Sequence, residues 1–219
     1  MKKVVLVLSA LALFGILISC KQEPKLEKAK TTEPETSTVE VKIQELEPDN
    51  SFYRAEVAYI DQDFGKSSRE ILDGVAYIKK LLPFAKGEQK KELQKSIKQL
   101  TEFAANVRAD KVDGYEDFGY FFSQTGKALS AHHLILSETI AGTGTNDKEA
   151  AENLLKSIHF LRMAYAKSFE GISKEEQQNL QEYKEFAKKI IRKEEVNDVK
   201  KTFDNAFKNI SGQILILGN

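Results

Sequence analysis

Apolar residues recur every three or four positions through most of the chain after about residue 66, which is the spacing of one face of an α-helix. We therefore expect an all-α fold, an antiparallel helical bundle of about six helices. The start of the first helix stays open, because Phe52, Tyr59 and Ile60 either extend it or form a separate turn. The predicted segments are 67–84, 88–109, 113–141, one from about 147, one from about 173, and 196–213.

Two short motifs mark helix ends within this pattern. The run from Gly142 to Asn146 is rich in glycine and threonine, and it ends the long third helix. Ser173 is followed three residues later by Glu176, which is the spacing of a capping box at the start of a helix.

The helical pattern repeats within the chain. When the sequence is shifted along itself so that Ile71 falls on Leu154, the first two predicted helices align with the fourth and fifth. We call this shift the repeat offset. A shift that is two positions larger aligns the third helix with the sixth. Any two amphipathic helices align on their apolar faces, but that alternative does not explain polar identities or a register held over two helices. We expect two duplicated three-helix units, about 66–141 and 147–217. Other aligned pairs include Ile78 with Leu161, Phe103 with Phe186, Phe118 with Phe203, Lys91 with Lys174 and Glu102 with Glu185.

The first residues have the layout of a bacterial secretory signal. Lys2 and Lys3 precede an uncharged, mostly apolar run from Val4 to Ser19, which is shorter than the ~20 apolar residues of a membrane-spanning helix. The stretch Leu17-Ile18-Ser19-Cys20 resembles the lipobox of bacterial lipoproteins. That resemblance implies a signal peptide over 1–19, lipid on Cys20 and attachment to a membrane of the cell envelope. A plain signal peptide beside a chance cysteine is the alternative.

Lys21, and not an Asp, follows the cysteine. In this respect the sequence resembles lipoproteins that the sorting rule of enteric bacteria sends to the outer membrane. Residues 20–50 are rich in Lys, Glu, Thr and Pro and hold too little apolar surface to fold. We expect this segment to be a lipidated, disordered tether. The helical domain then spans 51–219, which suits a single domain.

Composition narrows the function further. The chain has 33 Lys and Arg against 33 Asp and Glu, so no basic excess predicts binding to nucleic acid. Cys20 is the single cysteine, which excludes a disulfide within the chain. Motifs for phosphate-binding loops and nucleophile elbows do not occur, and we expect no cofactor and no enzymatic activity. The expected partners are a membrane, through lipid on Cys20, and a protein of the envelope.

The three histidines are the candidate metal ligands. The third predicted helix carries His132 on its inward seam and His133 on its flank, and the remaining histidine is His159. Neighbours on a helix point about 100° apart, so His132 and His133 do not easily share one ion. Bundle metal sites also use Glu-x-x-His pairs, which are absent from the sequence. The preferred interpretation is that the histidines lie in the core or at its boundary with their hydrogen bonds satisfied. The alternative is a metal site.

An acidic cluster lies at the turn into the third predicted helix and comprises Asp110, Asp113, Glu116 and Asp117. Carboxylates suit a helix N-terminus, so the cluster needs no ligand to explain it. Tyr115 falls within the cluster and is expected at a core or boundary position of the helix.

Residues 103–129, FAANVRADKVDGYEDFGYFFSQTGKAL, resemble a helical domain of unknown function in bacterial periplasmic proteins. That domain sometimes accompanies metal-efflux adaptor subunits, but this chain lacks the Cys and Met residues often found after it. We expect a lipid-anchored, non-enzymatic binding or scaffold module that acts through a surface or groove between its two units. The alternative is a periplasmic metal-handling protein that uses His132, His133 or His159 with carboxylates.

Overall fold

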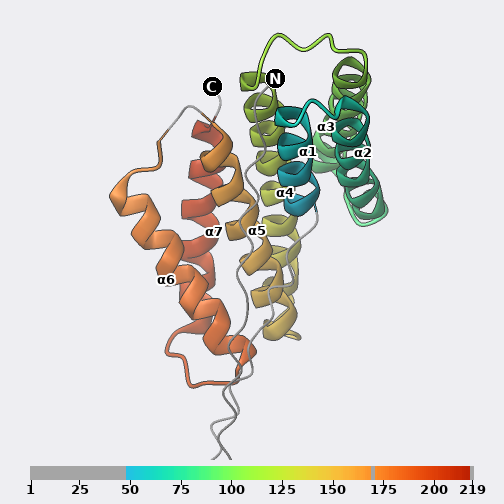
Figure 1. Ribbon diagram of the computed structural model, residues 1–219. Helices are drawn as coiled ribbons and strands as arrows, with labels where there is room; N and C mark the ends of the chain where they lie inside the picture. Colours follow the sequence, from blue (N-terminus) through green and yellow to red (C-terminus); the bar gives the residue numbers. More distant parts are fainter. Residues whose placement is uncertain (1–47, 169–170, 218–219) are drawn as a thin grey trace, which may run out of the picture. The chain divides into compact units, whose positions relative to one another are not determined.

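The computed structural model describes residues 48–168 and 171–217, and these residues form seven α-helices and no strand (Figure 1). The all-helical prediction is confirmed. Within the described ranges, every helix is too short or too polar to cross a membrane. The helices are α1 Asp49–Ile60, α2 Phe64–Leu81, α3 Gly87–Arg108, α4 Glu116–Thr143, α5 Asp147–Lys167, α6 Lys174–Ile191 and α7 Val199–Ile216.

The described residues hold seven helices where about six were predicted, and the additional helix is α1. The chain turns sharply after it, because Gln62 adopts a left-handed conformation with φ of 61° and donates its N–H to the Tyr59 carbonyl. The Asp63 carboxylate then accepts the N–H of Lys66 and caps the start of α2. Phe52 and Tyr59 therefore belong to a separate helix of 12 residues, too short for its periodicity to stand out in the sequence.

Helix α4 begins at Glu116, three residues later than predicted. Residues 109–115 instead connect α3 to α4, and the chain leaves α3 through Asp110, whose φ is 52°. Because the helix starts late, Tyr115 is 48% exposed and does not occupy a core position.

The two predicted helix-end motifs are confirmed. Helix α4 ends at Thr143, and Gly144 takes the left-handed conformation with φ of 64°, which costs glycine little because it has no Cβ. The Ser173 hydroxyl accepts the N–H of Glu176, and the Glu176 carboxylate accepts the N–H of Ser173. This reciprocal pair starts α6.

Buried apolar side chains form two clusters. The first gathers α1, α2, α3 and the N-terminal part of α4, and the second gathers the C-terminal part of α4 with α5, α6 and α7. Phe160 and Met163 of α5 also reach the first cluster, so α4 and α5 contribute to both. We call residues 48–130 the first half of the domain and the described residues from 131 to 217 the second half.

Helices α4 and α5 approach each other closely through small residues. A Cβ atom on Gly126 would lie 2.9 Å from the Phe160 carbonyl oxygen, and one on Gly119 would lie 2.9 Å from the Lys167 carbonyl oxygen. Real Cβ atoms do not come that close, so any larger residue at either position would push the helices apart.

The hairpin α1–α2 and the hairpin formed by α4 and α5 are bridged at matching positions. The Ser67 hydroxyl donates to the Ala55 carbonyl at 2.8 Å, and the Ser137 hydroxyl donates to the Ala150 carbonyl at 2.7 Å. The repeat offset places Ser67 on Ala150, and a shift one position smaller places Ala55 on Ser137. The same two positions are therefore joined in both halves, with the serine on opposite helices.

Helix ends also correspond between the halves. Asp63 and Asn146, which align at the repeat offset, each accept the N–H of the residue three positions later and cap α2 and α5. Asp110 and Lys193, which align in the same way, end α3 and α6 in left-handed conformations with φ of 52° and 59°. Each donates its N–H to the carbonyl three residues earlier.

One aromatic contact recurs with nearly the same geometry. The rings of Phe103 and Phe118 meet edge to face, with centroids 4.8 Å apart and planes at 78°. The rings of Phe186 and Phe203 do the same at 5.0 Å and 82°. These residues join α3 to α4 and α6 to α7.

Candidate functional site

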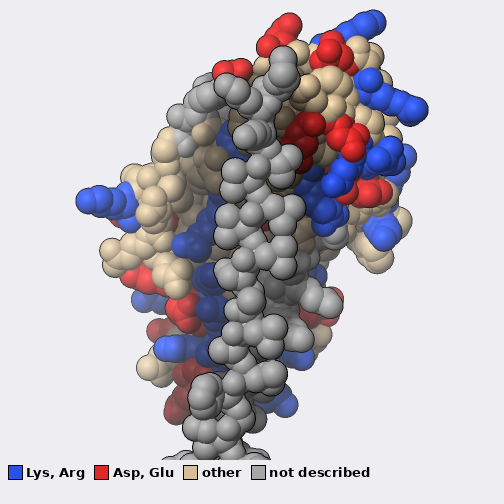
Figure 2. Space-filling view, viewed as in Figure 1, with Lys and Arg blue, Asp and Glu red and all other residues tan. Residues whose placement is uncertain are grey.

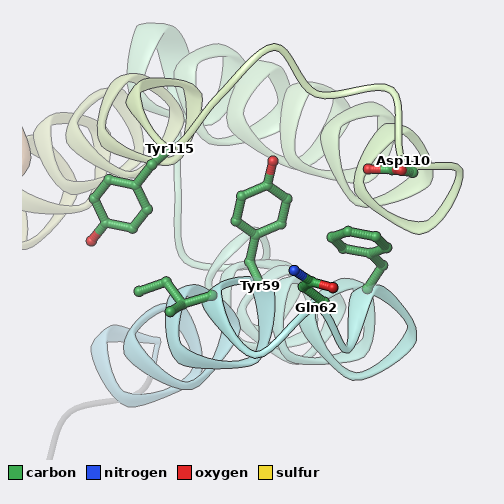
Figure 3. A pocket seen from close by; sticks show the side chains of 6 residues that line it. Tyr59, Gln62, Asp110 and Tyr115 are labelled. Carbon is green, nitrogen blue, oxygen red and sulfur yellow. The ribbon is translucent and has the colours of Figure 1, made fainter.

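A groove of about 570 Å³ lies between the α1–α2 turn and the connection from α3 to α4 (Figure 3). Its volume falls within the range of small-molecule sites, ~300–1,000 Å³. Figure 3 shows Tyr59 and Gln62 on the wall formed by the α1–α2 turn, and Asp110 and Tyr115 on the facing wall. We call this site the aromatic groove; its lining residues are Tyr59, Ile60, Gln62, Phe64, Asp110 and Tyr115.

Aromatic rings form the floor and walls of the groove. The Tyr59 ring packs against Phe64 with centroids 5.5 Å apart, and against the buried Phe118 at 4.7 Å. Tyr115 stacks on the same Phe118, with centroids 6.1 Å apart and planes at 17°. Phe118 thus supports both tyrosines from the core, and their other surfaces face the groove.

A buried ion pair lies near Tyr115. Glu56 of α1 is 3% exposed, and its two carboxylate oxygens lie 2.7 and 2.5 Å from the Lys167 ammonium at the end of α5. Burial raises the pKa of the Tyr115 phenol, and the nearby Glu56 carboxylate raises it further. Tyr115 is therefore an uncharged phenol that lies near the Glu56–Lys167 pair.

Carboxylates surround the groove. The segments 59–64 and 109–116 that build it carry five carboxylates, all exposed, and a single lysine, Lys111. Figure 2 shows acidic side chains beside Lys and Arg side chains at the end of the molecule where the α3–α4 connection runs in Figure 1. Five carboxylates against one lysine give the two segments themselves a formal charge of −4. The five residues are Asp61, Asp63, Asp110, Asp113 and Glu116.

A second groove, of about 540 Å³, occupies the corresponding place in the second half. It lies between the α4–α5 turn and the start of α7, and its lining includes the counterparts of five aromatic-groove residues. At these five positions the second groove has alanine, glycine or a charged side chain, whereas three of the five residues of the first groove are aromatic. At the repeat offset or within two positions of it, Tyr59 corresponds to Ala141, Ile60 to Gly142, Gln62 to Gly144, Phe64 to Asp147 and Tyr115 to Lys200.

Both histidines of α4 are buried. His132 is 2% and His133 3% exposed, although His133 was expected on the flank of the helix. His133 is covered by Phe160 of α5, whose ring stacks on it at 5.6 Å, and its Nδ1 lies 3.1 Å from the Asn153 amide oxygen. Burial lowers the pKa of both imidazoles, that of His133 to about 3. Both are therefore neutral groups of the core at physiological pH.

His159 lies at the boundary of the core, with Nε2 3.4 Å from an Asp49 carboxylate oxygen. The Phe160 ring contacts both His159, at 5.2 Å, and His133, at 5.6 Å. Among the described residues, however, no three His, Cys, Asp or Glu side chains converge in a way that could hold a metal ion. Cys20, the predicted lipidation site, lies outside the described residues.

Sequence reasoning named Asp110 and Tyr115 but missed the groove that unites them with Tyr59 and Phe64. It also missed the pair Glu56 and Lys167, which are 111 residues apart and look like ordinary surface charges. The exposed aromatic residues next to two turns were the available signal. Comparison with protein-family models, curated proteins and solved structures found no match to this chain.

Proposed function

We propose that this protein is a lipid-anchored, non-enzymatic binding module of the bacterial cell envelope, and that the aromatic groove is its binding surface. The observation that carries the binding role is the groove itself, which is open and of small-molecule size. Its lining offers three rings for stacking, an amide and a carboxylate, with no nucleophile beside a base. Such a lining is suited to recognition and lacks the parts of a catalytic site.

The membrane anchor in this proposal rests on the Leu17–Cys20 motif. It predicts that cells supplied with an alkyne-labelled fatty acid label the wild-type protein and do not label the Cys20→Ala variant. The labelled protein should sediment with outer-membrane fractions. Equal labelling of the Cys20→Ala variant would exclude Cys20 as the lipidated residue, without bearing on the groove.

We further propose that the domain is an antiparallel bundle that arose by duplication, with four helices in each unit. The hydroxyl bridges, the helix caps and the Phe–Phe contacts support this, because each recurs at the repeat offset or within two positions of it. Under this alignment α1 corresponds to the C-terminal part of α4, and the N-terminal part of α4 corresponds to α7. Helix α4 then belongs to both units, which accounts for seven helices where two separate units would have eight.

The binding role is tested by a photo-crosslinking residue at position 115 in living cells. We expect illumination to add a discrete mass to the intact protein, and we expect Tyr59→Leu to abolish it. The matched control carries the photo-crosslinking residue at position 120 on α4. Tyr120, which it replaces, is 53% exposed and lies outside the groove. Equal capture at 115 and 120, or none at 115, would exclude the groove as the binding surface.

A further inference from the structure

We propose that the aromatic groove binds an organic ammonium ion, held by cation–π contacts with its rings and by the charge of the surrounding carboxylates. This inference rests on the proposed function and names the ligand class of the same site. An ammonium ion is the group that both features attract, since aromatic faces carry negative potential and carboxylates carry negative charge.

The rings provide the first argument. Tyr59, Phe64 and Tyr115 line one groove, and Tyr59 and Tyr115 are fixed by their contacts with Phe118. Both tyrosine rings are packed against Phe118, so part of their side-chain entropy is already lost before a ligand settles between the rings. Rings that are already in place are the recurring feature of sites that recognise alkylated ammonium groups.

Charge provides the second argument. Asp110 lines the groove, and the two segments that build it carry five carboxylates against Lys111. The Lys167 ammonium is already paired with the Glu56 carboxylate. An anion would meet repulsion from these carboxylates, and a neutral ligand such as a sugar would gain nothing from their charge.

The second groove provides the third argument because it acts as an internal comparison. Lys200 stands where Tyr115 stands in the first half, and Asp147 stands where Phe64 stands. The rings that line this groove, Phe203 and Phe207, are buried in the core. A cation would therefore meet a fixed positive charge and no exposed aromatic face, so we expect binding at the first groove alone.

The test is a titration of the intact protein with choline in low-salt buffer. The chain has no tryptophan and 7 tyrosines, so the emission is that of tyrosine, and Tyr59 and Tyr115 contribute two of the seven signals. The control ligand is 3,3-dimethylbutan-1-ol, in which an uncharged tert-butyl group replaces the trimethylammonium. We expect choline to saturate the signal and the alcohol to bind about 5-fold or more weakly. Nα-acetyllysine amide is the second probe.

Variants locate the site. We expect Tyr115→Leu to weaken choline binding about 5- to 10-fold and Asp110→Asn about 3-fold, while Tyr120→Leu leaves it unchanged. Asp110 and Tyr115 are exposed, although one face of Tyr115 packs on Phe118, and a thermal melt of each variant checks that the fold is retained. Tighter binding of choline than of acetyllysine amide supports a quaternary ammonium ligand, and the reverse supports a primary ammonium such as that of a lysine side chain.

Three results would overturn the proposal. They are equal binding of choline and its neutral isostere, equal loss in Tyr115→Leu and Tyr120→Leu, and no saturation by either cation at concentrations on the order of 100 mM. These outcomes are separable from failure of the proposed function. If the residue at position 115 is crosslinked in cells but no ammonium ion binds in the titration, the groove is retained as a binding surface and only this ligand class is rejected.

Discussion

The two halves of the domain have matching cores and different exposed turns. Both bridge their helical hairpins with a buried serine hydroxyl, and both join two helices through an edge-to-face pair of phenylalanines. The first half nevertheless has an aromatic groove at its hairpin turn, whereas the second half has glycines, Asp147 and Lys200 there. Burial constrains core residues in both halves, while turn residues can change without loss of packing.

A second difference lies inside the hairpins. In the first half, Arg54 of α1 forms an ion pair with Glu70 of α2 at 2.7 Å, on a partly exposed face. In the second half, Asn153, which aligns with Glu70 at the repeat offset, instead meets His133 in a buried contact of 3.1 Å. One pair stays charged beside water, and the other stays neutral within the core, so acid should affect the halves unequally.

The largest expected effect tests whether the cores are equivalent. Phe118→Ala and Phe203→Ala each remove a buried ring, 0% and 2% exposed, from the matching edge-to-face pairs. We expect each to lower the free energy of unfolding by about 3–5 kcal/mol, measured by urea denaturation. Tyr120→Ala, on the exposed side of α4, should change it by less than about 0.5 kcal/mol.

Because α4 and α5 contribute to both clusters, unfolding of each variant should remain a single transition. Two separate transitions would show that the halves unfold independently. If Phe203→Ala lowers the free energy of unfolding far less than Phe118→Ala does, the matching geometry of the two ring pairs does not contribute equally to stability.

The Glu56–Lys167 pair should break the equivalence, because Phe84 stands at the position that aligns with Lys167 at the repeat offset and is 67% exposed. Lys167→Met leaves the Glu56 carboxylate buried without its counter-charge, and we expect a loss of about 3 kcal/mol. The double variant Glu56→Gln/Lys167→Met should recover part of this loss, which a double-mutant cycle measures. Strict additivity of the two single changes would show that the pair contributes nothing beyond its separate groups.

How far the sequence predicts this structure depends on where each residue's partners lie. The faces of α2 and α5 were predictable because Ile71 and Leu154 follow a regular helical spacing and are both fully buried. The same spacing could not show that Phe160 would cover His133, since that contact depends on how closely α4 and α5 approach at Gly126.

The candidate site was less predictable than the core. Tyr115 looked like part of a helical face, and only the late start of α4 at Glu116 brings it to the surface. Glu56 and Lys167 meet across 111 residues of chain, a contact that no local spacing encodes. Groove residues come from two turns whose proximity is a result of packing, so their joint role appears only in the folded chain.

Acid should affect the His133–Asn153 contact of the second half. Burial lowers the pKa of His133 from 6.5 to about 3, so the unfolded chain binds a proton that the folded chain excludes. Stability is therefore complete above about pH 6.5 and falls as pH drops towards 3, by about 2 kcal/mol at pH 5 from this group.

Urea unfolding at pH 7 and pH 5 measures this loss. His133→Gln keeps a side chain that can hydrogen-bond to Asn153 and does not titrate, so its stability should change by about 2 kcal/mol less over the same interval. An unchanged pH dependence in His133→Gln would assign the acid sensitivity to other groups.

The smallest expected effect concerns the helix caps that begin α2 and α5. Asp63→Ala and Asn146→Ala each remove the side-chain acceptor for the N–H three residues later, and we expect each to cost about 1 kcal/mol. Asp61→Ala, in the same turn but without a capping bond in the described contacts, should cost less than about 0.5 kcal/mol. Similar costs at 63 and 146 would mean that the turns have kept a shared role in stability while the groove residues between them diverged. A cost confined to one cap would mean that the turns differ in stability as well as in chemistry.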